Sequence, residues 1–313
     1  MKVLFHYDAG PALKKQLESL KSQGLDIVCC PEGPEQPFMD ELKDAEVIWH
    51  VLHPLTRDII EQAPKLKLIQ KIGVGTNTID LDAAKEKGII VCNMPGTNSQ
   101  ATAEMTLLLM MAALRRLLIM DNTCRSGQWR ITKETEEQLF EIKGKTIGLV
   151  GFGGIPKILA PILEAMGANI VYTATKEKSD VKYHYLSLDE LLKQSDIVSL
   201  HAALTNATDK MINQRALSLM KDGAILVNAG RGALIDESAV YEALVSGKLG
   251  AAGFDVFTQE PVNEDNPLLA LDNVVLSPHL GWLTRETLDR SVEVAAKNSV
   301  SIWDDTPLVF RVA

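Results

Sequence analysis

Three polar residues in the second half of the chain come within five residues after predicted strands, where their side chains could take part in chemistry. Arg231 follows the strand 224–228, Glu260 follows 250–255, and His279 follows 274–276. Open parallel sheets bind their ligands at the carboxyl ends of the strands. An imidazole can transfer a proton near neutral pH, and a guanidinium is a fork of donors that suits a carboxylate or a carbonyl oxygen. Taken singly, each residue could equally be a surface arginine, a turn glutamate or a satisfied histidine.

A glycine-rich turn joins the predicted strand 146–150 to a helix that ends near residue 166. Its residues are Gly151-Phe152-Gly153-Gly154-Ile155-Pro156. A turn of this kind lets the pyrophosphate of a dinucleotide approach the backbone at a helix N-terminus. Two prolines depart from the usual pattern: Pro156 replaces the third glycine, and Pro161 removes a backbone hydrogen bond inside the helix. We therefore expect a distorted helix, with a pyrophosphate site that is displaced or weaker than usual.

No acidic residue follows the next predicted strand, 169–172, where NAD-binding folds usually carry one for the ribose 2′-hydroxyl. The chain continues there with Ala174, Thr175 and Lys176. Without a carboxylate, nothing at this place repels a 2′-phosphate, and Thr175 and Lys176 could bind one. Lys176 could otherwise be a solvated loop lysine. The sequence thus favours NADP(H) over NAD(H).

Short apolar runs alternate with amphipathic segments through most of the chain. The predicted strands are 2–5, 27–29, 47–50 and 68–72 in a first series, and 146–150, 169–172, 197–200, 224–228, 250–255 and 274–276 in a second. The segment 12–23 carries leucines at helical spacing. Such alternation predicts parallel strands joined by crossover helices, and therefore an α/β protein with two doubly wound domains.

Residues 103–120 read as one helix that is apolar on nearly all sides. Such a helix is either buried in the core or part of a subunit interface, and its pattern does not decide between them. Its apolar run stops at Arg115 and Arg116, which leaves it too short to cross a bilayer.

Length, charge and cysteine content exclude several classes of protein. A chain of 313 residues suggests two domains, and its net charge of −9 argues against nucleic-acid binding. The first ten residues contain no long apolar signal core, so we expect neither export nor a membrane partner. The four cysteines fit no zinc pattern and are expected to be reduced thiols in the cytoplasm. They are Cys29, Cys30, Cys92 and Cys124.

The glycine turn, Arg231, Glu260 and His279, in this order, resemble the D-isomer-specific 2-hydroxyacid dehydrogenase family, as does the loop Lys71-Ile72-Gly73-Val74-Gly75-Thr76-Asn77. This family includes glyoxylate/hydroxypyruvate reductases, formate dehydrogenase and phosphoglycerate dehydrogenase. The resemblance covers essentially the whole chain. It implies a Rossmann-type cofactor domain, residues 98–282, inserted into a flavodoxin-like substrate domain, residues 1–97 plus 283–313.

The resemblance also implies an activity, namely hydride transfer between a nicotinamide cofactor and a small 2-keto acid or D-2-hydroxy acid, with glyoxylate or hydroxypyruvate favoured. His279 would exchange the proton of the carbonyl oxygen. Glu260 would bind the other ring nitrogen and favour the protonated imidazole. Arg231 would bind the carboxylate or carbonyl oxygen, and the N–H groups of Val74 and Gly75 would hold the carboxylate.

Further positions follow from the resemblance. Leu52 and Trp282 would border the substrate pocket. Besides the turn and residues 174–176, the cofactor would contact Thr102, His201, Ala229, Gly230, Asp255 and His279. His6, His50, His53 and His184 are expected to be structural or surface residues. Of these, His53 lies in the segment Leu52-His53-Pro54, which is expected to border the substrate pocket.

We also expect a homodimer formed through the 103–120 helix. Two alternatives to an active enzyme remain open. One is a cofactor-sensing, corepressor-like protein, suggested by Pro156 and Pro161, and the other is an enzyme with little cofactor affinity.

Overall fold

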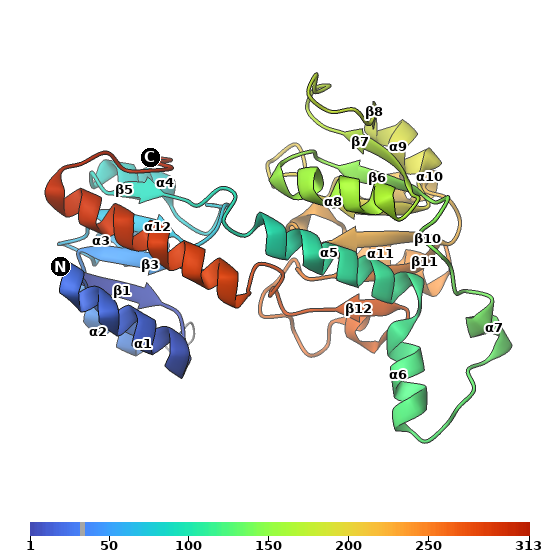
Figure 1. The fold of residues 1–313 in the computed structure, drawn as a ribbon, viewed down its shortest axis with the longest axis horizontal. Coiled ribbons are helices and arrows are strands. Elements are labelled where there is room, and N and C mark those ends of the chain that lie inside the picture. Colours follow the sequence, from blue (N-terminus) through green and yellow to red (C-terminus); the bar gives the residue numbers. More distant parts are fainter. Residues whose placement is uncertain (32–34) are drawn as a thin grey trace. The chain divides into compact units, whose positions relative to one another are not determined.

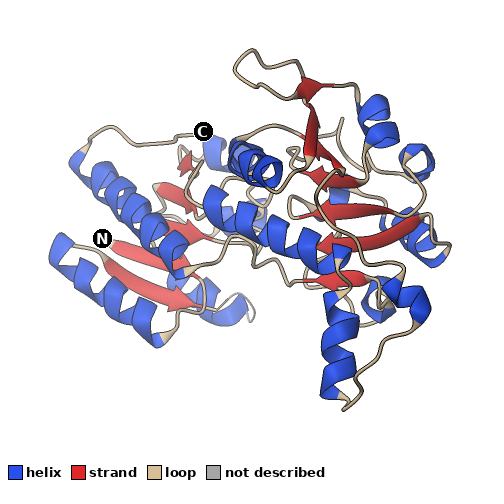
Figure 2. Cartoon of the chain, turned by 45° about the vertical axis from the view of Figure 1, so that its right-hand side comes forward, coloured by secondary structure: helices blue, strands red, loops and turns tan. Residues whose placement is uncertain are grey.

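The computed structural model describes residues 1–31 and 35–313. The chain divides into two compact units, Met1–Asn98 with Leu283–Ala313, and Ser99–Trp282 (Figure 1). Each unit has its own parallel sheet with helices against it, as the cartoon in Figure 2 shows. The predicted α/β class with two parallel sheets is confirmed.

The sheet of the first unit has the order β2-β1-β3-β4-β5, which is the flavodoxin-like order. Its strands are β1 (Lys2–His6), β2 (Asp26–Cys30), β3 (Val47–His50), β4 (Leu68–Lys71) and β5 (Ile90–Cys92). Four of them were predicted to within one or two residues. The fifth, β5, was not predicted.

Helices cover both faces of this sheet. They are α1 (Pro11–Ser19), followed by a 3₁₀ turn (Leu20–Gln23), α2 (Glu35–Leu42), α3 (Arg57–Glu61), α4 (Leu81–Glu86) and α12 (Arg285–Asp304). On one face, Trp49 Nε1 donates to Ser299 Oγ at 3.0 Å and Asn298 Nδ2 donates to Gln70 Oε1 at 2.6 Å. These buried contacts to α12 explain why the last residues of the chain fold with the first.

The sheet of the second unit has the order β12-β11-β10-β9-β6-β7-β8. Its strands are β6 (Thr146–Val150), β7 (Asn169–Thr173), β8 (His184–Tyr185), β9 (Ile197–Leu200), β10 (Ala224–Asn228), β11 (Leu249–Phe254) and β12 (Val274–Leu276). The order reverses between β6 and β9, which are neighbours, as in a Rossmann-type sheet. The two-residue edge strand β8 was not predicted.

The helices of the second unit are α5 (Ser99–Leu114), α6 (Leu117–Arg125), α7 (Lys133–Glu136), α8 (Gly154–Ala165), α9 (Leu188–Gln194), α10 (Gln214–Leu219) and α11 (Glu237–Val245), with 3₁₀ turns at Gly232–Leu234 and Pro267–Ala270. Helix α5 lies against α8 and the strands β10 and β11. A Cβ atom at Gly253 would lie 2.9 Å from Leu109 Cβ, so this glycine allows the close approach of α5 to β11.

The prediction of a single helix over 103–120 is wrong, because the chain breaks between α5 and α6 at Arg116. This residue adopts a left-handed conformation, with φ of 49°. Its buried guanidinium donates to Gln138 Oε1 and to the carbonyl oxygen of Gly250, both at 2.7 Å. The apolar pattern continues across the break, so it does not reveal the turn that these two hydrogen bonds stabilise. Helix α5 is mostly buried, whereas α6 has no buried residue and exposes Leu117 and Leu118.

Helix α8 is not broken at Pro161, although the sequence predicts a distorted helix. The helix runs continuously from Gly154 to Ala165, with Pro161 inside it. Pro161 lies on the exposed side, as does Lys157, whose carbonyl group would otherwise accept the missing hydrogen bond. Water can satisfy a carbonyl group there, so the proline costs less than it would on a buried face.

Candidate active site

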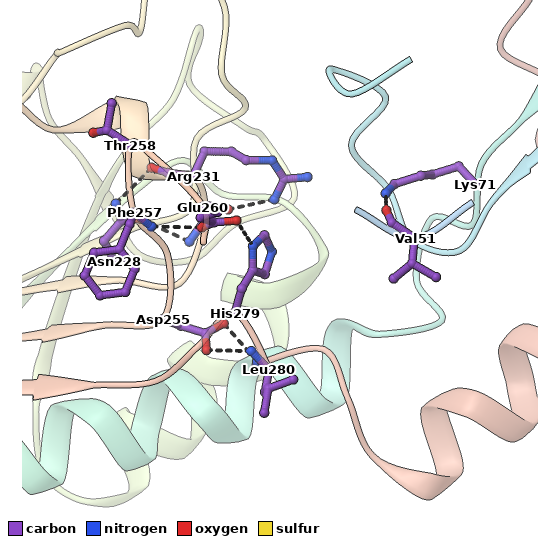
Figure 3. A network of polar contacts seen from close by, with 12 residues as sticks. Val51, Lys71, Asn228, Arg231, Asp255, Phe257, Thr258, Glu260, His279 and Leu280 are labelled. Carbon is purple, nitrogen blue, oxygen red and sulfur yellow. Dashed lines mark hydrogen bonds and ion pairs between the residues drawn. The ribbon is translucent and has the colours of Figure 1, made fainter. Parts of the chain in front are cut away.

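The imidazole of His279 and the carboxylate of Glu260 form a close pair in the second unit. His279 Nδ1 lies 2.5 Å from Glu260 Oε2, and both side chains are shielded from solvent for the most part (Figure 3). Burial raises the pKa of Glu260. The hydrogen bond and charge of His279, the N–H of Phe257 and the charge of Arg231 lower it more, so that the net pKa falls below its ordinary value. The pair therefore holds a charged carboxylate against one ring nitrogen of His279.

Asp255 holds the backbone on which His279 stands. His279 has a φ of 56°, and its N–H donates to the carbonyl oxygen of Asp255 at 2.7 Å. The Asp255 carboxylate accepts the N–H groups of Leu280 and Gly281 at 2.9 and 2.8 Å. Burial raises the pKa of this carboxyl group, and hydrogen bonds from Ser277 and from these N–H groups oppose that shift. Through these bonds Asp255 fixes the positive-φ turn that presents the imidazole.

Glu260 is held by a second hydrogen bond besides the one to His279. Its Oε1 accepts the N–H of Phe257 at 2.9 Å. The two carboxylate oxygens thus have different partners, one in the main chain and one in the imidazole. This division fixes the orientation of the carboxylate and directs Oε2 toward the ring.

Arg231 is positioned by a buried asparagine at the end of β10. Asn228 Nδ2 donates to the carbonyl oxygen of Arg231 at 2.9 Å, and the N–H of Gly230 donates to Asn228 Oδ1 at 3.0 Å. Burial lowers the pKa of the Arg231 guanidinium, against the opposing charge of Glu260. A side chain at Gly232 would overlap the main chain of Phe257, so a glycine is required directly after Arg231. Asn228 was not predicted from the sequence, where it reads as the last residue of a strand.

The glycine turn before α8 has the shape that a dinucleotide needs. Gly151 has a φ of 94°, and a Cβ atom there would lie 2.7 Å from the main chain of His201 and Ala202. A Cβ atom at Gly153 would meet nothing within 4 Å, so open space lies before the N-terminus of the helix. A Cβ atom at Gly154 would lie 2.9 Å from Oγ of Ser99, the first residue of α5, so a glycine is needed here for α5 to lie close to the turn. Gly151, Gly153 and Gly154 therefore fit the pyrophosphate of a nicotinamide dinucleotide.

The buried ring of Pro156 lies in the first turn of α8, after Ile155. N–H groups in the first turn of a helix have no acceptor within the helix, so the proline loses no hydrogen bond there.

Beyond β7, the residues expected at the ribose lie at the surface. Ala174 accepts a hydrogen bond at its carbonyl oxygen from Tyr185 Oη at 3.3 Å, while Thr175 and Lys176 are exposed. Among the described residues, Lys176 makes no ion pair. His201, after β9, is partly buried, and its Nε2 lies 2.9 Å from Ser199 Oγ. Burial lowers the pKa of His201 to about 3, so the ring is neutral at physiological pH.

Other predicted cofactor residues also lie within the second unit. Thr102 is buried on α5, and Ala229 and Gly230 directly follow β10. Trp282 is partly buried three residues after His279.

The predicted substrate loop lies in the first unit, after β4. Gly73 has a φ of 138°, a conformation suited to glycine, and its carbonyl oxygen accepts the N–H of Met94 at 2.8 Å. Asn93 Nδ2 donates to the carbonyl oxygen of Val74 at 3.0 Å. Within the described part of the chain, the N–H groups of Val74 and Gly75 meet no acceptor. The loop can therefore offer two main-chain donors to an anion. Leu52 follows β3 at the same end of the sheet.

Residues 1–31 and 35–313 contain no cluster of three or more histidine, cysteine or acidic side chains that could hold a metal ion. None of the helices described has the length and apolar character needed to cross a membrane.

Comparison with known proteins agrees with this geometry. Residues 107–281 match the family model described as D-isomer specific 2-hydroxyacid dehydrogenase, NAD binding domain. A glyoxylate reductase of Aeropyrum pernix is 39% identical over 277 residues, covering 86% of this chain and 83% of its own. A hydroxypyruvate reductase of Thermotoga maritima is 42% identical over 247 residues, covering 78% and 80%. The crystal structure of a glyoxylate reductase from Paecilomyes thermophila superposes with a TM-score of 0.85 at 33% identity, covering 100% and 98%. The chain belongs to the D-isomer specific 2-hydroxyacid dehydrogenases, a family of nicotinamide-dependent oxidoreductases.

Proposed function

We propose that this chain reduces glyoxylate or hydroxypyruvate to the corresponding 2-hydroxy acid, with His279 as the proton donor. The observation that carries the proposal is the 2.5 Å contact between His279 Nδ1 and Glu260 Oε2, with the buried Arg231 acting electrostatically on the same carboxylate. This arrangement leaves Nε2 of the imidazole as the atom that exchanges a proton with the substrate.

Each of these side chains has a separate task in the proposed reaction. The bound nicotinamide supplies or accepts the hydride. His279 donates a proton to the carbonyl oxygen during reduction and takes it back during oxidation. Glu260 stabilises the imidazolium, because its carboxylate is held ionised next to Nδ1. Arg231 binds an oxygen of the substrate through its planar fork of donors.

We assign the recognition of the substrate carboxylate to the loop after β4. The N–H groups of Val74 and Gly75 would donate to it, and Leu52 and Trp282 would limit the size of the acceptor. In this assignment residues 1–97 and 283–313 serve the substrate, and residues 98–282 serve the cofactor.

For the cofactor we propose NADP(H) in preference to NAD(H). The exposed Thr175 and Lys176 can contact a 2′-phosphate, and Ala174 stands where a carboxylate would repel it. The glycine turn gives a test of binding that is separate from turnover. Gly153→Ala should leave the unfolding midpoint unchanged, because its Cβ atom meets nothing, yet it should weaken the binding of NADPH by filling the open space. Unchanged NADPH affinity, measured by fluorescence titration, would contradict this placement of the pyrophosphate.

The activity is tested by steady-state oxidation of NADPH and of NADH, side by side, with glyoxylate and with hydroxypyruvate. We expect turnover with both acceptors, faster with NADPH, and a loss of about 10²–10⁴-fold in kcat for His279→Ala. Wild-type kcat in that variant would contradict the assignment of the proton donor. Faster turnover with NADH would contradict the cofactor preference alone.

The alternative of a cofactor sensor with little catalysis is not favoured. The similar proteins are named as reductases, and Pro156 and Pro161 leave α8 continuous from Gly154 to Ala165.

We further propose a homodimer formed through α5 and α6. Leu108, Leu117 and Leu118 are 57%, 46% and 42% exposed, which is unusual for three large apolar side chains on two consecutive helices. Light scattering should show a dimer at micromolar concentration, and a monomer would refute this assembly. We expect the protein in the cytoplasm, and its four cysteines are free.

A further inference from the structure

His50, the last residue of β3, contacts both ends of the loop that follows β4. Its carbonyl oxygen accepts the N–H of Ile72, where the loop begins, at 2.8 Å. Its imidazole Nε2 lies 2.9 Å from Oγ1 of Thr78, where the loop ends. The segment between them contains Val74 and Gly75. One residue at a strand end therefore joins the two ends of the loop to which the substrate carboxylate is assigned.

The imidazole of His50 is an expensive side chain for this place. It has no exposed surface, and its Nδ1 is buried without a hydrogen-bond partner. Native proteins seldom leave a buried polar atom unsatisfied, and a leucine would fill the same space with no polar atom at all. Within residues 1–31 and 35–313, the only hydrogen bond of this side chain is the one to Thr78. That bond is therefore what the imidazole contributes to the first unit.

The surroundings of His50 keep its ring uncharged. Burial is the main cause that lowers the pKa of His50 well below its ordinary value, and the charges of Lys71, His6 and His53 lower it further. A neutral imidazole has one N–H and one bare nitrogen atom. The hydroxyl of Thr78 can donate to a bare Nε2 or accept from an Nε2–H, so the bond can form in either tautomer.

Two hydrogen bonds from the segment after β5 orient the loop between its ends. The N–H of Met94 donates to the carbonyl oxygen of Gly73 at 2.8 Å, and Asn93 Nδ2 donates to that of Val74 at 3.0 Å. In a planar trans peptide the C=O and the N–H point in opposite directions. The N–H groups of Val74 and Gly75 belong to these same two peptides, so both point away from residues 93 and 94. They can then donate together to one carboxylate.

We propose that the hydrogen bond between His50 and Thr78 positions the N–H groups of Val74 and Gly75 for the substrate carboxylate. His50 and Thr78 are then positioning residues, which act through the loop and do not themselves bind the substrate. This inference rests on the proposed function, because it takes the binding of the carboxylate by this loop as given.

The main chain near Thr78 limits what the loss of this bond can do. The N–H of Leu55 donates to the carbonyl oxygen of Thr78 at 2.8 Å, and the N–H of Asp80 donates to that of Leu55 at 3.0 Å. These bonds remain when the hydroxyl group is removed. A variant at Thr78 should therefore fold, with a loop that is less well fixed.

The test separates the hydroxyl group of Thr78 from the shape of its side chain. Thr78→Val keeps the shape and loses the hydroxyl group, whereas Thr78→Ser keeps the hydroxyl group. Thr78→Val should raise KM for glyoxylate and for hydroxypyruvate by about 3- to 10-fold, the loss of one neutral hydrogen bond, and change kcat less than about twofold. The effect falls on KM because the carboxylate is bound alike in the ground state and in the transition state. Thr78→Ser should keep KM within about twofold of the wild type.

A double-variant cycle then tests whether His50 and Thr78 act through one bond. His50→Leu should raise KM as Thr78→Val does, and the double variant should raise it no further than either single change. The control is Thr306→Val, which makes the same substitution at an exposed threonine of the same unit and should leave both constants unchanged.

Three outcomes would overturn the inference. They are a wild-type KM in Thr78→Val, an equal rise of KM in Thr78→Ser, and multiplied effects in the double variant. A purely structural role would lower the unfolding midpoint without this split between KM and kcat and without rescue by serine.

Failure of the proposed function is recognised separately, as no turnover of either acceptor by the wild type. A readout without turnover then remains. Oxamate carries the carboxylate and carbonyl groups of a 2-keto acid and is not reduced, and it should raise the unfolding midpoint of the wild type and of Thr78→Ser more than that of Thr78→Val. An equal rise in the wild type and in Thr78→Val, or no rise in the wild type, would overturn the inference.

Discussion

Replacing Glu260 with glutamine tests the role of the carboxylate more sharply than deleting it would. In the protein, Oε1 accepts the N–H of Phe257 at 2.9 Å and Oε2 meets His279 Nδ1 at 2.5 Å. A glutamine has one oxygen for these two donors, and its amide nitrogen must face the other. The variant therefore removes the negative charge beside the imidazolium and mismatches one of two hydrogen bonds, while it keeps the size of the side chain.

The expected magnitude follows from this contact. A hydrogen bond to a charged partner contributes about 1.5–3 kcal/mol, and about 1.4 kcal/mol corresponds to a factor of ten. Because the variant removes the ionised carboxylate beside the ring, kcat/KM for reduction should fall by about 10- to 100-fold.

The assay is steady-state kcat/KM for hydroxypyruvate reduction, measured for the wild type, Glu260→Gln and a matched control. Glu264→Gln is that control, since Glu264 is an exposed glutamate in the same loop. We expect its kcat/KM to match that of the wild type. If Glu260→Gln also keeps the wild-type kcat/KM, the carboxylate does not support the imidazolium and the reasoning is wrong.

Three further predictions concern other parts of the second unit. Arg231→Lys should lower kcat/KM by at least about tenfold in the same steady-state assay, because an ammonium cannot replace a two-pronged donor, and a wild-type value would show that the fork is not needed. Gly151→Ala should reduce the free energy of unfolding by more than about 1 kcal/mol, because its Cβ atom would lie 2.7 Å from the main chain of His201; an unchanged urea midpoint would contradict the clash. Burial lowers the pKa of His201 from 6.5 to about 3, so between these pH values the ring is protonated in the unfolded chain and neutral in the folded one. The free energy of unfolding should therefore fall as the pH drops from 6.5 toward 3. His201→Gln should flatten this dependence by up to about 1.4 kcal/mol per pH unit, and an equal slope in both proteins would refute it.

Local pattern predicted the strands, because a buried parallel strand is apolar on consecutive residues. The strands 47–50, 197–200 and 224–228 have the predicted bounds in the structure. Pattern did not predict the short strands β5 and β8, and it failed where apolar residues continued across a turn. At Arg116 the turn depends on a hydrogen bond to Gly250, 134 residues further along the chain, and no local window contains that partner.

The same distinction holds for the candidate site. Residue type and position after a strand were enough to single out Arg231, Glu260 and His279, since the chemistry of an imidazole or a guanidinium belongs to the side chain itself. The resemblance implied that Glu260 binds a ring nitrogen of His279, but only the tertiary structure decided that this nitrogen is Nδ1 and that Asp255 holds the turn beneath the ring. The bond between His50 and Thr78 was likewise invisible in the sequence, where the two residues lie 28 positions apart and His50 reads as the polar end of a strand. The fold brings this strand end against the loop, and burial then lowers the pKa of the imidazole, a property that its sequence position does not reveal.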